Sequence, residues 1–466
     1  DNDTIEDLIS ILTTQEKIAM CHAQSKFSSP GVPRLGIPEL WMSDGPHGIR
    51  AELNWDDWKY ANWTNDYVTA FPALTCLAAT FNPDLSMEYG ICIGEEARYR
   101  KKDVLLGPGV NIYRTPLNGR NFEYMGEDPY LASVMVVPYI KGVQKNGVAA
   151  CVKHFALNNQ ELSRGHINVE VSDRALHEIY LPAFKAAVKE GNAWAIMGAY
   201  NKFRGQHCCH NEILLNKILK NSWGFDGVVI SDWGGTHNTN ESIFNGLDIE
   251  MGTPPNKNQS ERFPYSSNFL GEPFLEKIMK GDVKESILND KVRRILKLMF
   301  RTSLNKDRPF GSINNKHHYK TAYKVATEGI VLLKNFDGFL PLNNKEEITI
   351  AVVGENAKKI MSIGGGSSEL KVDKEITPFD GIQKEFNKAV IKYAKGYSSN
   401  ENGNKINLRN EAISIAQQAD VVLFIGGLNK NSFQDSEATD RKHYELPYGQ
   451  PALIEEISKY LSLIHI

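Results

Sequence analysis

The chain has 466 residues, of which 41% are hydrophobic and 23% charged, and its 53 basic and 56 acidic residues leave a net charge of −3. This length is too great for one ordinary core and predicts a globular protein of two domains. The composition excludes several classes: no basic stretch suits nucleic acid or an anionic membrane, no apolar run reaches transmembrane length, and six cysteines are too few for a disulfide-built scaffold.

The first two-thirds of the chain alternates short apolar runs with amphipathic stretches, which is the pattern of a parallel sheet built from β/α units. Polar or charged residues follow most of the apolar runs, as they do on the C-terminal face of an α/β barrel. We therefore expect an α/β fold with a (β/α) TIM-like barrel over residues 1–300. Its strands are expected at 104–106, 149–152, 194–197, 228–230 and 247–249, and its helices at 175–189, 212–222 and 284–300.

A linker over residues 301–343 is expected to contain one helix, at 318–328, and an extended stretch at 331–333. A second α/β unit follows over residues 344–466. Three strands in that unit leave a parallel sheet with an uncovered edge, and the last six residues fit poorly as an ending. We therefore expect an incomplete α/β sandwich domain from a natural protein that is longer. Its strands are expected at 348–353, 389–393 and 421–425, and its helices at 411–418 and 451–461.

The segment at 227–235 carries the clearest local signal, because a short β-branched run leads directly into Asp232 and Trp233. Such a run between glycines is typical of a buried parallel strand. A carboxylate beside an indole at the end of a barrel strand can attack and hold a sugar ring. Alternatively, Asp232 is only the N-cap of a helix that starts near Thr236. The segment alone leaves these two interpretations even.

Motifs in order along nearly the whole chain resemble those of glycoside hydrolase family 3, the family of β-glucosidases and β-xylosidases. Each would be weak alone, but their order makes the resemblance specific. In the first unit they are SDGPHGIR at 43–50, GRNFE at 119–123, GEDP at 126–129, KHF at 153–155, MGAYN at 197–201 and SDW at 231–233. In the rest they are VLLKN at 331–335, GGGSS at 364–368, and DR at 440–441 before LP at 446–447.

The resemblance implies retaining hydrolysis with two carboxylates, which lie about 5–5.5 Å apart in such enzymes. It places the nucleophile at Asp232 and the acid/base at Glu437, three residues before the Asp-Arg pair. Here Glu-Ala replaces the usual Glu-Gly, and Asp435 and Glu369 are rival acids. A solvated acidic loop is the non-catalytic interpretation. We also expect a bell-shaped pH–rate profile, with its acidic limb from Asp232 and its basic limb from a Glu437 held protonated.

A sugar pocket around the two carboxylates is a further implication of the resemblance. Asp44 matches a carboxylate that accepts hydrogen bonds from sugar hydroxyls, although an Asp-Gly-Pro turn also explains it. Lys153 at a buried strand end favours binding over a satisfied core residue by about three to one. Trp233 could stack on a sugar or only pack. The expected substrate-binding residues are Asp44, Arg120, Lys153, His154, Tyr200 and Trp233.

Two other features suggest different chemistry and are interpreted structurally. The run His-Cys-Cys-His at 207–210 offers metal-type ligands, but contiguous side chains cannot all point at one ion, so we expect no metal site. The loop at 364–368 lacks the lysine of a P-loop, and we interpret it as an active-site loop over the barrel. Glu127 and Asp128, before Pro129, are expected to begin a helix.

The function implied by the resemblance is a retaining exo-β-glycosidase, a β-glucosidase that removes terminal β-D-glucosyl residues from an oligosaccharide or β-glucoside by double displacement. Asp44 favours this over a β-xylosidase of the same family. The alternatives are a non-catalytic sugar-binding fragment and a glycoside phosphorylase. No cofactor, nucleic acid or membrane is implied.

The compartment and oligomeric state stay open, because Asn-x-Ser/Thr triplets arise often by chance and favour a secreted or extracellular protein only weakly. These triplets begin at Asn2, Asn62, Asn240 and Asn258.

Overall fold

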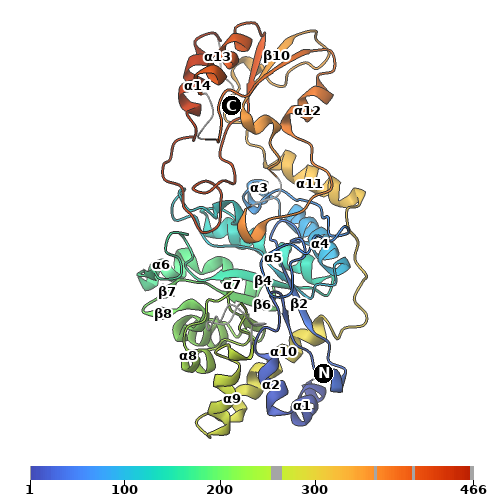
Figure 1. Ribbon diagram of the computed structural model, residues 1–466, viewed down its shortest axis with the longest axis vertical. Coiled ribbons are helices and arrows are strands. Elements are labelled where there is room, and N and C mark those ends of the chain that lie inside the picture. The colour runs from blue at the N-terminus through green and yellow to red at the C-terminus, as the bar shows by residue number, and fades with distance from the viewer. Residues whose placement is uncertain (1, 253–264, 362–364, 401–404, 462–466) are drawn as a thin grey trace.

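Two α/β units are stacked along the longest axis of the protein (Figure 1). The computed structural model describes residues 2–252, 265–361, 365–400 and 405–461. Three features singled out in the sequence lie outside this part of the chain: the triplet at Asn258, Gly364 of the glycine-rich loop, and the final five residues. Over the described residues, no helix is both long and apolar enough to cross a membrane.

The lower unit is built around a curled parallel sheet. Its strand order is β1–β2–β3–β4–β6–β9, and only the β1–β2 pair is antiparallel. Every residue of β3, β4, β6 and β9 is buried, as expected for strands that helices cover. The strands are β1 (Ser28–Ser29), β2 (Leu40–Asp44), β3 (Val104–Leu106), β4 (Ala149–Phe155), β6 (Ala195–Gly198) and β9 (Val228–Ile230).

Isolated bridges, rather than full strands, close the sheet into a barrel. Ile249 bridges to Ile230 at the end of β9, and Glu250 bridges in turn to His22, just before β1. The strand expected at 247–249 is therefore wrong. The carboxylate of Asp248 accepts the N–H of Val229 at 2.8 Å, so a side chain occupies a place where a strand would offer a backbone carbonyl.

The helix expected at 284–300 is confirmed as α10 (Glu285–Arg301), and proline lies at the starts of α4, α5, α7 and α9. Asp128 caps α5 by accepting the N–H groups of Tyr130 and Leu131, so the expected helix start is confirmed. The helix expected at 175–189 is split before Pro182, at the start of α7. The barrel helices are α1 (Asn2–Ile11), α2 (Thr14–Met20), α3 (Leu74–Ala79), α4 (Pro83–Tyr99), α5 (Pro129–Gln144), α6 (Asp173–Ala175), α7 (Pro182–Lys189), α8 (Thr239–Phe244), α9 (Glu272–Met279) and α10 (Glu285–Arg301), with π-helical turns at Leu176–Tyr180 and Glu212–Ser222.

A small sheet beside the barrel rim adds β5 (Asn168–Val169), β7 (Lys202–Phe203) and β8 (Gln206–His207). The linker that follows the barrel carries α11 (Lys316–Gly329), which packs on α3 and α4. The stretch at 331–333, expected to be extended, is exposed and belongs to no strand of the described residues.

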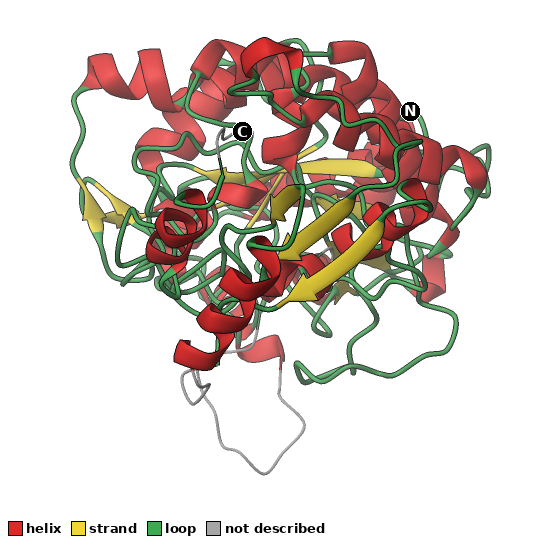
Figure 2. Ribbon diagram, turned by 90° about the horizontal axis from the view of Figure 1, so that it is seen from above, coloured by secondary structure: helices red, strands yellow, loops and turns green. Residues whose placement is uncertain are grey.

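The upper unit is a three-stranded parallel sheet in the order β11–β10–β12, with helices on both faces (Figure 2). Helix α12 packs on one face around Ile350 and Val352, and α13 and α14 pack on the other around Val353. The unit is therefore an α/β sandwich. Its elements are β10 (Thr349–Val353), α12 (Pro378–Glu385), β11 (Val390–Ala394), α13 (Lys405–Ala416), β12 (Val421–Phe424) and α14 (Gln450–Ser458).

Candidate active site

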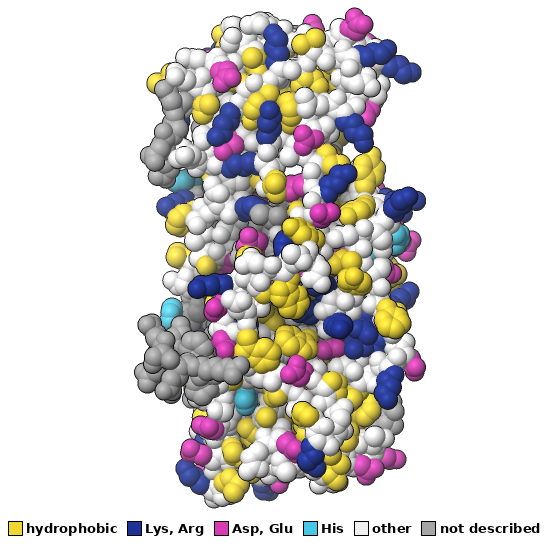
Figure 3. All heavy atoms as spheres, turned by 45° about the vertical axis from the view of Figure 1, so that its right-hand side comes forward, with side chains coloured by type: hydrophobic (Ala, Val, Ile, Leu, Met, Phe, Trp, Pro, Cys, Tyr) yellow, Lys and Arg dark blue, Asp and Glu magenta, His cyan; other side chains and the backbone are white. Residues whose placement is uncertain are grey.

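A polar pocket lies between the carboxyl ends of the barrel strands and two loops of the upper unit. Its cavity measures about 360 Å³, within the range of small-molecule sites. Hydrophobic and basic side chains lie on the surface at mid-height of the molecule, between the two units (Figure 3). All eight side chains expected to act in catalysis or binding line it: Asp44, Arg120, Lys153, His154, Tyr200, Asp232, Trp233 and Glu437. It is also lined by Arg50, Trp58, Arg164, Met197, Gly366, Ser367 and Glu369.

Asp232 stands at the end of β9 with one carboxylate oxygen held and the other turned to the pocket. The N–H of Trp233 donates to its Oδ1 at 2.8 Å, whereas Oδ2 is buried and accepts no hydrogen bond from a described residue. Helix α8 begins later, at Thr239, and Asn238 is its cap, so the helix-cap interpretation of Asp232 is wrong. The free Oδ2 is the atom available to attack a substrate.

His154 faces this free oxygen across 3.8 Å, measured from its Nε2. Asn158 donates to the hydroxyl of Tyr124 at 3.1 Å, and that hydroxyl lies 3.1 Å from Nδ1 of His154. When this hydroxyl donates its one proton to Nδ1, the imidazole proton lies on Nε2, the nitrogen that faces Asp232. Burial, with Arg120 nearby, holds the pKa of His154 well below its ordinary value. A neutral ring therefore offers an N–H donor to the pocket.

Glu123, a fully buried carboxylate, pairs with two cations in one wall of the pocket. Its Oε2 lies 2.5 Å from Nε of Arg120 and its Oε1 lies 3.7 Å from Nζ of Lys153. Burial alone would raise the pKa of Glu123, but these two cations reverse the effect and lower it. Lys153 also lies 3.6 Å from Asp44, which has Arg50 at 3.4 Å on its other side. Sequence reasoning placed Arg120, Lys153 and Asp44 here but not Glu123, the buried anion that pairs with Arg120 and Lys153.

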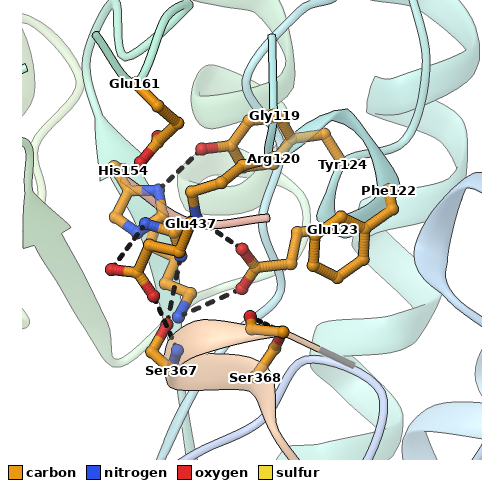
Figure 4. Close-up of polar contacts among 12 residues, drawn as sticks. Gly119, Arg120, Phe122, Glu123, Tyr124, His154, Glu161, Ser367, Ser368 and Glu437 are labelled. Carbon is orange, nitrogen blue, oxygen red and sulfur yellow. Dashed lines mark hydrogen bonds and ion pairs between the residues drawn. The ribbon is translucent and has the colours of Figure 1, made fainter. Parts of the chain in front are cut away.

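Glu437 reaches this wall from the loop that follows β12. Its Oε1 lies 2.9 Å from Arg164 and 3.6 Å from Arg120, and its Oε2 accepts the N–H of Ser367 at 2.6 Å. Figure 4 shows Glu437 between Arg120 and the turn of Ser367. The glycine-rich loop approaches Glu437 so closely that a Cβ on Gly366 would lie 2.4 Å from the side chain of Glu437. Glycine, which has no Cβ, avoids this clash.

The two carboxylates are displaced in opposite directions. Burial raises the pKa of Asp232 above its ordinary value, although Arg164 and Arg120 oppose it. Burial also acts on Glu437, but Arg120, Arg164 and the N–H of Ser367 outweigh it and hold the pKa of Glu437 far below its ordinary value. The expectation that Glu437 is held protonated is therefore wrong for this arrangement, because two guanidinium groups stabilise its anion.

The rival acids occupy different places. Glu369 lines the rim of the pocket. Asp435 is not among the described residues that line the pocket, although burial raises its pKa to about 6. Of the three candidates on the upper unit, Glu437 is the one held by cations of the barrel.

Three pocket residues escaped sequence reasoning. Arg50 ends the SDGPHGIR motif and was quoted only as part of it. Arg164 lies on an irregular loop after β4 and carries no periodic signal; its guanidinium stacks 4.4 Å from the ring of Tyr200. Trp58 is half exposed at the pocket mouth, within 6.1 Å of Phe27 between ring centroids, and Phe27 in turn packs on Trp233. The density of tryptophan at 55–63 was the available signal for Trp58.

The His-Cys-Cys-His run at 207–210 makes packing contacts beside the barrel. The thiols of Cys208 and Cys209 are buried against backbone carbonyls, and the ring of His207 stacks on His237 at 3.9 Å. Nδ1 of His210 lies 2.7 Å from the carboxylate of Glu241, and burial lowers the pKa of His210 to about 4. In the described part of the chain, no group of three or more His, Cys, Asp or Glu side chains is placed to hold a metal ion.

Comparison with known proteins identifies the family. The profile of the glycosyl hydrolase family 3 N terminal domain matches residues 9–298, and that of the C-terminal domain matches residues 330–462. The chain belongs to glycosyl hydrolase family 3. The resemblance and the fold class expected from the sequence are thereby confirmed, since solved β-glucosidases share the fold.

Individual relatives cover nearly all of this chain. A β-glucosidase of Bacteroides ovatus is 59% identical over 98% of the chain and 63% of its own length. An exo-α-(1→6)-L-arabinopyranosidase of Bifidobacterium longum is 36% identical over 96% of the chain and 58% of its own length. The structure of β-glucosidase 3B from Thermotoga neapolitana in complex with glucose has a TM-score of 0.85 at 32% identity, covering 98% of this chain and 67% of that one. The chain thus spans about six-tenths of the length of these curated relatives.

Proposed function

We propose that the protein is a retaining exo-β-glycosidase, a β-glucosidase that removes terminal β-D-glucosyl residues by double displacement. One observation carries the proposal: a barrel carboxylate, Asp232, and an upper-unit carboxylate, Glu437, line the same small pocket of polar donors. Paired carboxylates are the equipment of glycoside hydrolysis. The similarity to β-glucosidases supports the same substrate class.

In the proposed reaction, Oδ2 of Asp232 attacks the anomeric carbon while Glu437 protonates the departing oxygen. Water, deprotonated by Glu437, then releases the sugar from Asp232. Asp44 accepts hydrogen bonds from sugar hydroxyls, and the cations Lys153 and Arg120 donate to them.

In the free protein Asp232 binds a proton more readily than Glu437, which is the reverse of the order that the proposed reaction needs. We expect bound substrate to shift this order. Sugar hydroxyls that take hydrogen bonds from Arg120 and Arg164 compete with Glu437 for those donors, so its affinity for a proton rises. The kcat/KM profile reports the free protein, in which the pKa of Glu437 lies below that of Asp232, so the acidic limb belongs mainly to Glu437 and the basic limb to Asp232. This reverses the assignment expected from the sequence.

The test is release of nitrophenol by this chain from aryl β-D-glucoside, β-D-xyloside and α-L-arabinopyranoside, with NMR of the first-formed anomer. We expect fastest cleavage of the glucoside with retention, and none by Asp232→Ala, which should still bind glucose by calorimetry. Faster xyloside or arabinopyranoside cleavage would reassign the substrate, and inversion would exclude the mechanism. Glucose binding without any release would favour a sugar-binding fragment.

A further inference from the structure

The loop that carries Glu437 is fastened to the barrel by a second acidic side chain, Asp440, three residues later. Its Oδ1 accepts the backbone N–H groups of Gly119 at 3.0 Å and Glu161 at 2.9 Å. Its Oδ2 accepts the N–H of Leu162 at 2.9 Å and shares that of Glu161 at 3.1 Å. One carboxylate from the upper unit thus joins two separate segments of the barrel.

Backbone bonds run parallel to this contact. Ser436 donates its N–H to the carbonyl of Gly119 at 2.9 Å, and Arg441 donates to that of Leu117 at 2.8 Å. The N–H of Ala438 is accepted by the side chain of Glu161 at 2.8 Å. The loop is therefore tied to the barrel on both sides of Glu437.

The two barrel segments held by Asp440 also carry the two arginines that contact Glu437. Gly119 immediately precedes Arg120, and Glu161 binds Arg164 at 2.6 Å. Movement of Asp440 relative to these segments would therefore change the distance between the Glu437 carboxyl and the rest of the pocket. Figure 4 shows Gly119, Arg120 and Glu161 grouped around Glu437.

We propose that Asp440 is a positioning residue, which sets the place of Glu437 over the barrel by binding the backbone amides of Gly119, Glu161 and Leu162. Asp440 is not among the described pocket-lining residues, so it acts through the loop rather than on the sugar. Charge-assisted bonds to backbone amides are stronger and more directional than neutral ones, which suits a contact that must hold two domains in register. The proposal rests on Glu437 being the acid of the proposed function.

The test variant is Asp440→Asn, which keeps the shape but turns an amide N–H₂ toward backbone N–H donors. Acid catalysis matters most for poor leaving groups, so kcat/KM for methyl β-glucoside should fall about tenfold or more, while that for dinitrophenyl β-glucoside should change by less than about threefold. Asp420→Asn is the matched control, because Asp420 accepts the N–H of Thr349 at 2.8 Å within the upper unit and away from the barrel. The control should show no such selectivity.

Hydrogen exchange separates this proposal from the proposed function. The amides of Gly119, Glu161 and Leu162 should exchange faster in Asp440→Asn than in the parent or the control, whatever the activity. Equal losses on both glucosides, no loss, or unchanged exchange would overturn the proposal. A parent chain that cleaves neither glucoside would contradict the proposed function. Hydrogen exchange at the three amides would then be the test of the Asp440 contact. If Asp440→Asn does not fold, Gly119→Ala must reproduce the selective loss; its failure to do so would also overturn the proposal.

Discussion

The contact between the loop of Glu437 and the barrel leaves no room for a side chain at Gly119. A Cβ there would lie 1.9 Å from the carbonyl oxygen of Thr439 and 2.3 Å from that of Ser436. Carbon and oxygen need about 3.3 Å, so the two oxygens would have to retreat by about 1.4 and 1.0 Å. Both atoms belong to the backbone that flanks Glu437, so this proposed acid must move with them.

We therefore expect Gly119→Ala to reduce kcat/KM for methyl β-glucoside by about 100-fold, since a misplacement of about 1 Å can cost that much. The loss should be much smaller for dinitrophenyl β-glucoside, whose leaving group needs no proton. Gly165→Ala is the control, because a Cβ at Gly165 meets no atom within 4 Å and lies beside Arg164 on the same barrel face. A folded Gly119→Ala protein with undiminished activity on methyl β-glucoside would refute the argument.

The remaining predictions concern a linker histidine, the pocket mouth and the acid. Burial disfavours the charged form of His318, but hydrogen bonds to Glu96 and Glu95 outweigh it and raise the pKa of this histidine. Its contribution to stability is therefore complete below the pKa of the unfolded state and is lost as the pH rises through the pKa of the folded state. His318→Gln, unlike the control His317→Gln at an exposed site, should therefore reduce the fall in Tm as the pH rises above the ordinary histidine pKa of about 6.5; a fall in Tm parallel to that of the parent would contradict this. Trp58→Ala should lower kcat/KM for a β-linked disaccharide about 3- to 10-fold more than for methyl β-glucoside, through lost stacking at the mouth; equal effects would remove Trp58 from the acceptor side. Arg164→Met should move the acidic limb of the kcat/KM profile to higher pH, because a cation that lowers the pKa of Glu437 is lost; an unmoved limb would assign it elsewhere.

The parts of the fold that sequence predicts well are those with a local cause. The strands at 104–106 and 228–230 have the expected bounds because each is a short β-branched or aliphatic run closed by turn residues. The place of Asp232 at a strand end follows from the adjacent residues for the same reason, whereas its expected role as the nucleophile came from the family resemblance. The strand expected at 247–249 failed because Asp248 uses its side chain to bond the neighbouring strand, a choice that composition does not reveal.

The rest of the site depends on contacts between distant segments. Arg164 has no periodic context, and it matters only because the upper unit brings Glu437 within 2.9 Å of it. Glu437 itself lies on an irregular loop, where propensity and periodicity assign nothing, and the family resemblance supplied it. The pKa of Glu437 also depends on distant segments, because the arginines that lower it belong to the barrel. The same loop alone in water would lack these two cations.

The proposed acid and the proposed nucleophile lie on different units, so their meeting depends on the same contacts between distant segments. The barrel fixes Asp232 rigidly at the end of a buried strand, and it also supplies the cations and the backbone amides that receive the loop of the upper unit. In the proposed mechanism, the upper unit contributes the carboxylate of Glu437 to the reaction, and Asp440 holds the loop of Glu437 on the barrel. Loss of docking would thus leave a barrel that still has Asp44, Lys153 and His154 to bind a sugar but has no proton donor. Binding and turnover are consequently separable in this architecture, and a variant that retains glucose affinity while losing only acid-dependent substrates marks the interface rather than the pocket.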